Sequence, residues 1–104
     1  MAAVHVIAII TTKPGMRDAV LAHFRDNKPA VHAEDGCLFY EPTIDADGIG
    51  PIQTKLGPDS FVVVEKWASA AHLEAHAQAP HMAAYATKVR DMLAGRVIHV
   101  LSEV

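Results

Sequence analysis

The sequence of 104 residues contains one cysteine, no run of basic residues and no apolar stretch of membrane-spanning length. A single cysteine, Cys37, excludes an intramolecular disulfide and a zinc cluster built from thiolates. Because basic and aromatic residues do not alternate anywhere, we do not expect nucleic-acid binding. The first residues lack the basic and apolar regions of a signal peptide, so we expect a cytoplasmic protein without a membrane span.

Apolar residues, in contrast, are abundant. They make up 51% of the chain, and the mean hydropathy is +0.17, which is high for so short a sequence. A chain of this length is expected to form one domain, here residues 1–104. Its own core is modest in size, so part of the apolar surface is expected to be buried against a partner.

The pattern of apolar residues and breakers predicts four strands and three helical segments. The strands are expected at Ala3–Thr12, Cys37–Ile44, Ser60–Trp67 and Arg96–Ser102. The helices are expected at about 15–34, kinked or split near Pro29, at 70–77 and at 80–93, where Gly95 ends the last one. This order is that of an α+β, ferredoxin-like fold, β-α-β-β-α-β, with helices on one face of the sheet.

A long loop is expected at Asp45–Asp59, where several Gly-Pro and Asp-Gly pairs occur. We predict a short extended segment at Ile52–Lys55 within it. Loops of this length in small domains are usually functional or mobile, so this loop is predicted to shape or cover the opening of a pocket.

The first, third and fourth predicted strands are apolar on both faces. A ferredoxin-like sheet covers only one face with helices, and the other face should be polar if it meets water. A bare apolar face of this size is typical of an interface. We therefore predict a homodimer in which the two sheets pack against each other.

The segment 61–82 combines an apolar strand, Trp67 and three histidines, His72, His76 and His81. Apolar bulk next to titratable imidazoles is typical of a small-molecule pocket that transfers protons. An ordinary strand followed by an amphipathic helix has the same composition, so both interpretations stay open. The spacing of His72 and His76 is that of a helical zinc motif, but Leu73 occupies the position that needs glutamate. We do not expect a metal site.

Several motifs resemble one known family. They are Glu34-x-Gly36-Cys37, Glu65-Lys66-Trp67, His72-Leu73-x-x-His76 and Pro80-His81-Met82. Together with the predicted order of elements, they resemble the antibiotic biosynthesis monooxygenase superfamily, and within it the quinol monooxygenases. The resemblance implies a dimeric α+β barrel with a pocket between sheet and helices. It also implies oxidation or oxygenation of a quinol-like aromatic by molecular oxygen without flavin, haem or metal.

Two sister branches fit less well. The haem-degrading branch shares the tryptophan at Trp67 but needs an asparagine in the first strand and a histidine in the last helix. Residues 3–12 contain no asparagine, and residues 82–93 contain no histidine. The autoinducer-processing isomerase branch shares the Pro-His pair at Pro80-His81. Trp67 and the long loop favour the quinol branch instead.

The quinol anion is a better electron donor than the neutral quinol, so the reaction needs a base. Histidine, with an unperturbed pKa of about 6.5, is the obvious candidate, and we predict His76 and His81 as the catalytic residues. Trp67, Tyr40 and Tyr85 are expected to contact the substrate ring. His72 is a further candidate, although a solvated side chain at the helix start is its alternative.

Three functions remain open. The first is a cofactor-independent quinol monooxygenase or oxidase. The second is a dimeric ligand-binding or stress-associated protein that uses the same fold without turnover. The third is a non-redox enzyme of the fold, such as an isomerase. For all three functions, packing in the core is the simpler explanation of the aromatic residues. A core residue can still form the wall of a pocket.

Overall fold

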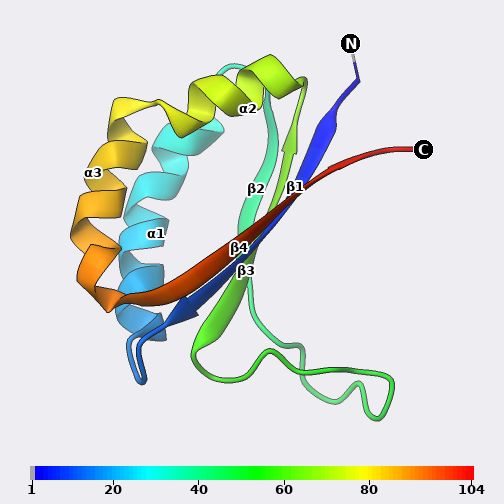
Figure 1. The fold of residues 1–104 in the computed structure, drawn as a ribbon, viewed down its shortest axis with the longest axis vertical. Helices are drawn as coiled ribbons and strands as arrows, with labels where there is room; N and C mark the ends of the chain where they lie inside the picture. The colour runs from blue at the N-terminus through cyan, green and yellow to red at the C-terminus, as the bar shows by residue number, and fades with distance from the viewer. Residues whose placement is uncertain (1) are drawn as a thin grey trace.

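The computed structural model describes residues 2–104 and shows a four-stranded antiparallel sheet with helices over one face (Figure 1). The strands lie in the order β2-β3-β1-β4. The elements are β1 (Val4–Thr12), α1 (Arg17–His32), β2 (Cys37–Thr43), β3 (Ser60–Trp67), α2 (Ala70–Ala77), α3 (Pro80–Val89), a 3-10 turn (Arg90–Met92) and β4 (Leu93–Ser102). The predicted ferredoxin-like order is confirmed, with its second helical region divided into α2 and α3.

The helix predicted to end at about residue 93 corresponds to α3 and the 3-10 turn, which together end at Met92, but the predicted start of the last strand at Arg96 was wrong. Helix α3 ends at Val89, and β4 already begins at Leu93. Gly95 therefore does not end a helix but pairs with Thr11 of β1. Backbone pairing with β1, which continues past a register shift at Thr11/Thr12 to reach Leu93, outweighs the helical spacing of the apolar residues, because it satisfies backbone polar groups. The predicted extended segment at Ile52–Lys55 is also absent, and this stretch is an irregular loop.

Helix α1 runs through Pro29 without being split. The proline lies in the last turn, where it removes one backbone donor, and its own carbonyl accepts a hydrogen bond from the N–H of Ala33 at 3.1 Å. Late placement explains why the helix tolerates it. Among residues 2–104, none of the helices is both long and apolar enough to cross a membrane.

The core lies between the sheet and the helices. Alternate residues of β3 point toward the helices because successive side chains of a strand face opposite ways. These are Phe61, Val63, Glu65 and Trp67, and all four are buried. Helix α1 covers them with one apolar stripe that includes Val20, Leu21, Phe24 and Val31. Each fully buried apolar side chain of this size contributes about 1.5–3 kcal/mol to stability.

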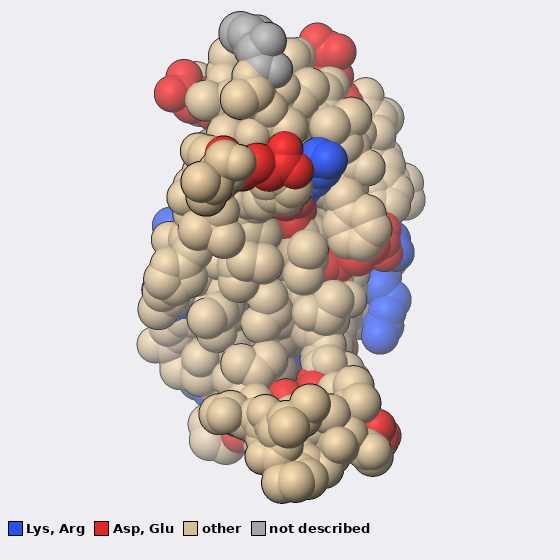
Figure 2. All heavy atoms as spheres, turned by 90° about the vertical axis from the view of Figure 1, so that its right-hand side faces the viewer, with Lys and Arg blue, Asp and Glu red and all other residues tan. Residues whose placement is uncertain are grey.

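Strand β4 is exposed on both of its faces. Val97 and Leu101, on the open face of the sheet, are 53% and 48% exposed. Ile98 and Val100 pair with the buried residues Ala8 and Val6 of β1, yet they are 48% and 53% exposed because the helices do not extend over β4. Figure 2 shows this open side of the molecule, where charged side chains are sparse in the middle and gather toward the rim. The predicted homodimer stays a prediction.

The loop between β2 and β3 is held at its base. The Asp45 carboxylate accepts hydrogen bonds from the backbone N–H groups of Leu56 and Gly57, both at 2.9 Å, and Arg17 donates to the carbonyls of Gly57 and Ser60 at 3.2 Å. The loop projects from the end of the sheet opposite α2 (Figure 1). It therefore lies about 23 Å, the length of β3, from Trp67. Within one chain, the structure does not support a loop that covers a pocket near the histidines.

Candidate functional site

One carboxylate oxygen joins two of the predicted histidines. Oε2 of Glu34 lies 2.8 Å from Nδ1 of His76 and 2.8 Å from Nε2 of His81. Glu34 is in the connection between α1 and β2, His76 is near the end of α2, and His81 is in the first turn of α3. Three separate segments of the chain thus converge on a single oxygen atom. The sequence predicted that the histidines lie near each other, and it did not predict the carboxylate between them.

Local sequence explains how two helices reach the same group. The Ser69 side chain caps α2 by accepting a hydrogen bond from the backbone N–H of His72. Helix α2 stops at Ala77, and Ala79 is extended, since the residue before a proline is disfavoured in the helical conformation. Pro80 then begins α3, where its missing N–H is not needed. The break redirects the chain so that residues 76 and 81 both face Glu34.

Aromatic rings surround His76. The ring centroid of Trp67 is 4.5 Å from that of His76 with a tilt of 32°, and the ring of Tyr40 is 5.4 Å away in an edge-on arrangement. Tyr40 in turn stacks on Phe24 at 5.1 Å, and Tyr85 meets Phe24 edge to face at 6.0 Å. The structure therefore brings Trp67, Tyr40 and His76 into direct contact, whereas Tyr85 reaches them through Phe24.

The position of Tyr40 depends on an irregularity in β2. Cys37 pairs with Trp67, but Phe39 pairs with Lys66, so that Leu38 is an extra residue of the bulge type. Leu38 and Phe39 are both exposed, at 57% and 48%. The extra residue places Tyr40, instead of Phe39, on the face that points toward the helices.

A second carboxylate lies next to this group. Glu65 is buried, and its Oε1 accepts a hydrogen bond from Nε1 of Trp67 at 2.9 Å. Burial raises the pKa of Glu65, while the Trp67 hydrogen bond and the nearby His76 act in the opposite direction. Glu65 fixes the indole ring, which fixes one wall beside His76.

Both tyrosines are poor bases in this environment. Burial raises the pKa of Tyr85 to about 12 and raises the pKa of Tyr40 further still. At neutral pH each is a neutral phenol that can donate a hydrogen bond or contact a ring, but neither can accept a proton as a phenolate. This leaves the imidazoles of His76 and His81 as the groups suited to proton transfer.

His72 lies apart from the shared carboxylate. Its Nδ1 is 2.7 Å from Oγ of Ser69, and its Nε2 is 3.3 Å from Oδ2 of Asp35. The ring packs on Gly36, where φ is +78° and a Cβ would overlap it. The three histidines thus do not converge on one point, and within residues 2–104 no group of three or more metal-ligating side chains has the geometry of a metal site. A substrate contact for His72 stays a prediction.

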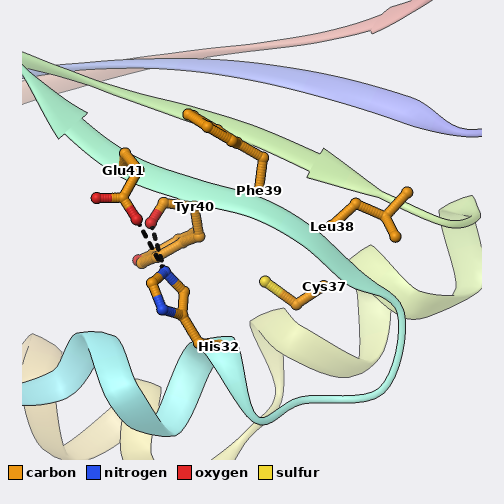
Figure 3. A pocket seen from close by; sticks show the side chains of 6 residues that line it. All are labelled: His32, Cys37, Leu38, Phe39, Tyr40 and Glu41. Carbon is orange, nitrogen blue, oxygen red and sulfur yellow. Dashed lines mark hydrogen bonds and ion pairs between the residues drawn. The ribbon is translucent and has the colours of Figure 1, made fainter.

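Two hollows lie close to these residues. The first, the α1–α3 hollow, has a volume of about 180 Å³ and is lined by His23, Asp26 and Asn27 of α1 and by His81, Tyr85 and Lys88 of α3. The second, the β2 hollow, has a volume of about 200 Å³ and is lined by His32 and residues 37–41. Figure 3 shows His32 pointing toward Glu41 and the Tyr40 carbonyl, with Phe39 on the opposite side of the strand. Of the two, only the α1–α3 hollow is lined by a histidine that contacts Glu34, namely His81.

Sequence analysis missed both carboxylates as functional candidates. Glu65 could have been found from the sequence. It alternates with Phe61, Val63 and Trp67 along the strand, so its carboxylate lies on an otherwise apolar face. Glu34 appeared only as part of the motif Glu34-x-Gly36-Cys37, and it lies in an irregular connection without periodicity. Its role emerges only when α2 and α3 are placed in space.

The order of the elements, with helices over one face of a four-stranded antiparallel sheet, is that of the ferredoxin-like class of α+β domains. Residues 3–88 match the family described as antibiotic biosynthesis monooxygenase, and the chain belongs to that family. It is 44% identical over 98 residues to a protein of Escherichia coli K12 named "Probable quinol monooxygenase YgiN", and the match covers 92% of this chain and 93% of that protein. A protein of the same name from Shigella flexneri is equally similar.

Solved structures of related proteins share the fold. PA3566 from Pseudomonas aeruginosa superimposes with a TM-score of 0.81 at 25% identity, covering 100% of this chain and 96% of that one. Rv0793 from Mycobacterium tuberculosis gives a TM-score of 0.80 at 28% identity, covering 99% and 96%. The similarity therefore extends from the first strand to the last.

Proposed function

We propose that the protein is a cofactor-independent monooxygenase or oxidase that acts on a quinol-like aromatic molecule with molecular oxygen. One observation carries the proposal: a buried imidazole, His76, contacts the rings of Trp67 and Tyr40 and is hydrogen-bonded to a carboxylate. Such a group combines an apolar surface for an aromatic ring with a base for its hydroxyl. The name of the Escherichia coli relative supports the same substrate class.

The chemistry begins with the transfer of a proton from a quinol hydroxyl to an imidazole nitrogen. The resulting anion donates electrons to oxygen more readily than the neutral quinol does. In the oxidase outcome, quinol and oxygen give quinone and hydrogen peroxide. In the monooxygenase outcome, oxygen adds to the ring, and loss of one water leaves a hydroxyquinone. Both balance without a further reductant, so the protein needs to supply only a base, an apolar site and exclusion of water.

The proposal assigns His76 and His81 as the catalytic pair and Trp67, Tyr40 and Tyr85 as contacts of the substrate ring. The burial of Trp67, Tyr40 and His76 supports this assignment, because a ring bound against them would be removed from water. The α1–α3 hollow, which His81 and Tyr85 line, is the proposed route of entry, since its volume of about 180 Å³ is on the scale of a small aromatic molecule. A cytoplasmic location also stays a prediction.

The proposed active form is a homodimer joined through the open face of the sheet. The support is the apolar surface of β4 on that face, where Val97 and Leu101 are each about half exposed. Apolar side chains of this exposure on an edge strand are unfavourable in water. A second copy that packs on this face would bury part of that surface.

Oxygen uptake with a naphthohydroquinone, followed by identification of the product, tests the proposal. After subtraction of spontaneous oxidation, the wild type should consume oxygen and release either hydrogen peroxide with the quinone or a hydroxyquinone. Absorption spectra and metal analysis of the purified protein should show neither flavin, haem nor metal. Tight binding of the quinol without oxygen uptake would instead indicate a ligand-binding protein, and a rearranged product without oxygen uptake would indicate an isomerase.

A further inference from the structure

Glu34 presents a single oxygen to two ring nitrogens. When Glu34 is ionised, its carboxylate only accepts hydrogen bonds, so both histidines must point an N–H group at it. His76 is then protonated at Nδ1, and His81 is protonated at Nε2. The lone pair of His76 is thereby placed on Nε2, on the side of the ring that does not face the carboxylate.

The two histidines differ in their surroundings. The side chain of His76 is 7% exposed, whereas that of His81 is 29% exposed. His76 packs against Trp67 and Tyr40, and His81 lines the α1–α3 hollow. Of the two, only His76 has the aromatic neighbours that a substrate ring needs, and its contact with Glu34 uses Nδ1, so Nε2 is the nitrogen that remains to accept a proton.

We propose that Glu34 is a positioning residue that holds His76 in the Nδ1–H form as the base, while His81 holds Glu34 in place from the other side. This inference rests on the proposed function and deepens it by assigning different roles to the two histidines. The carboxylate orients the imidazole and stabilises the positive charge that forms when Nε2 accepts a proton. The N–H of His81 restrains the same oxygen, so that Glu34 cannot turn away from His76.

Charged and titratable groups face this arrangement from several elements. Glu65 of β3 accepts the hydrogen bond of Trp67 and is near His76, while Cys37 and Tyr40 of β2 lie close to Glu34 and Glu65. Tyr85 of α3 is near Tyr40, and His23, Asp26 and Lys88 surround the hollow beside His81. The groups buried closest to His76 are carboxylates and neutral donors, so a proton on His76 meets no buried cation.

The first experiment compares Glu34→Gln with Glu41→Gln. Glu41 also pairs with a histidine, His32, at 3.0 Å, but on the outer side of β2, so it is the matched control. The acid limb of the kcat profile should shift to lower pH in Glu34→Gln, because an imidazole without a neighbouring carboxylate loses its proton more easily. At neutral pH kcat should fall more than KM rises. Glu41→Gln should match the wild type.

A second readout does not depend on turnover. Proton NMR should show a ring N–H signal of His76 that exchanges slowly with solvent, and exchange should become faster in Glu34→Gln but not in Glu41→Gln. Glu34→Asp, which keeps the charge, serves if Glu34→Gln does not fold, and it should lower kcat without the shift of the acid limb. An unchanged pH profile together with unchanged exchange in Glu34→Gln would overturn the inference.

The two histidines are separated by replacing each with glutamine. Glutamine offers an N–H donor to Glu34 but cannot act as a base. His76→Gln should therefore lower kcat by roughly 10²–10⁴-fold, and His81→Gln should lower it far less. Equal losses in both variants, or a larger loss in His81→Gln, would contradict the assignment. If the wild type oxidises no quinol, the proposed function fails, while the exchange of the His76 ring N–H still decides whether Glu34 holds it.

Discussion

The imidazole of His76 lies against the indole of Trp67, with ring centroids 4.5 Å apart and planes tilted by 32°. The indole is fully buried, and Glu65 holds its N–H, so its position is fixed by both packing and a hydrogen bond. His76 is fixed in the same way by Glu34. Both rings are therefore held in place, with the imidazole next to the face of an aromatic ring.

The first prediction concerns Trp67. Replacing it with phenylalanine preserves an aromatic ring but removes ring area and the N–H that Glu65 accepts. KM for the quinol should rise more than kcat falls, because the wall is altered while the base remains. Steady-state kinetics at several oxygen concentrations measure both. A lower kcat with KM unchanged would show that the indole takes part in the chemical step instead of binding.

The second prediction concerns the pH dependence of stability. Burial raises the pKa of Glu65 above the ordinary value of 4.5, so the folded state binds this proton more tightly than the unfolded state does. The resulting stabilisation is complete below pH 4.5 and is lost as pH rises through the raised pKa. Glu65→Gln removes this dependence and keeps an oxygen that accepts from Trp67. Its free energy of unfolding, relative to the wild type, should therefore increase with pH.

Urea unfolding at a series of pH values measures this difference, and the fluorescence of the single tryptophan reports on it. Glu74→Gln, at an exposed position on α2, is the control. A difference between Glu65→Gln and the wild type that stays constant with pH would show that burial does not perturb Glu65.

The third prediction is the homodimer. Sedimentation of the wild type at micromolar concentration should give about twice the chain mass of 11.2 kDa. Val97→Asp should give a monomer, since a charge buried in an apolar interface without a partner is strongly unfavourable. Ile52→Asp, on the loop at 88% exposure, should remain a dimer. A wild type that sediments as a monomer would leave the exposed surface of β4 without an explanation.

The fourth prediction concerns Gly36, which has a positive φ of +78° and lies against His72. Alanine there is strained in this backbone conformation by about 1–3 kcal/mol, and its Cβ would also overlap the His72 ring. Gly36→Ala should therefore lower the free energy of unfolding by more than that strain alone. Adding His72→Ala should restore the part due to overlap. If the second substitution restores nothing, the overlap is relieved in another way.

Much of the fold could be predicted because its strands are short runs rich in Val and Ile between turn-forming residues, and its helices have clear boundaries at Ser69 and Pro80. The start of the last strand could not, since Leu93 continues the helical spacing of the apolar residues, and only pairing with β1 decides that it begins a strand. The exposure of Ile98 and Val100 could not be predicted from the sequence either. Parity assigns them to the covered face, whereas the helices stop short of β4.

The site was predictable where chemistry-bearing residues cluster in sequence. His76 and His81 lie five positions apart and do converge, and Trp67 does contact His76. Glu34 is more than forty positions from either histidine in the chain. A contact of that separation has no local pattern, so it depends on how α1, α2 and α3 pack and becomes visible only in the folded structure.

The most direct test of the central claim is oxygen uptake with a naphthohydroquinone by the wild type and by His76→Ala at equal concentrations of folded protein. The account predicts a wild-type rate well above spontaneous oxidation and a loss of roughly 10²–10⁴-fold in the variant. A wild-type rate equal to spontaneous oxidation would contradict the proposed enzyme. A folded His76→Ala variant with the full rate would contradict the role of His76 as its base.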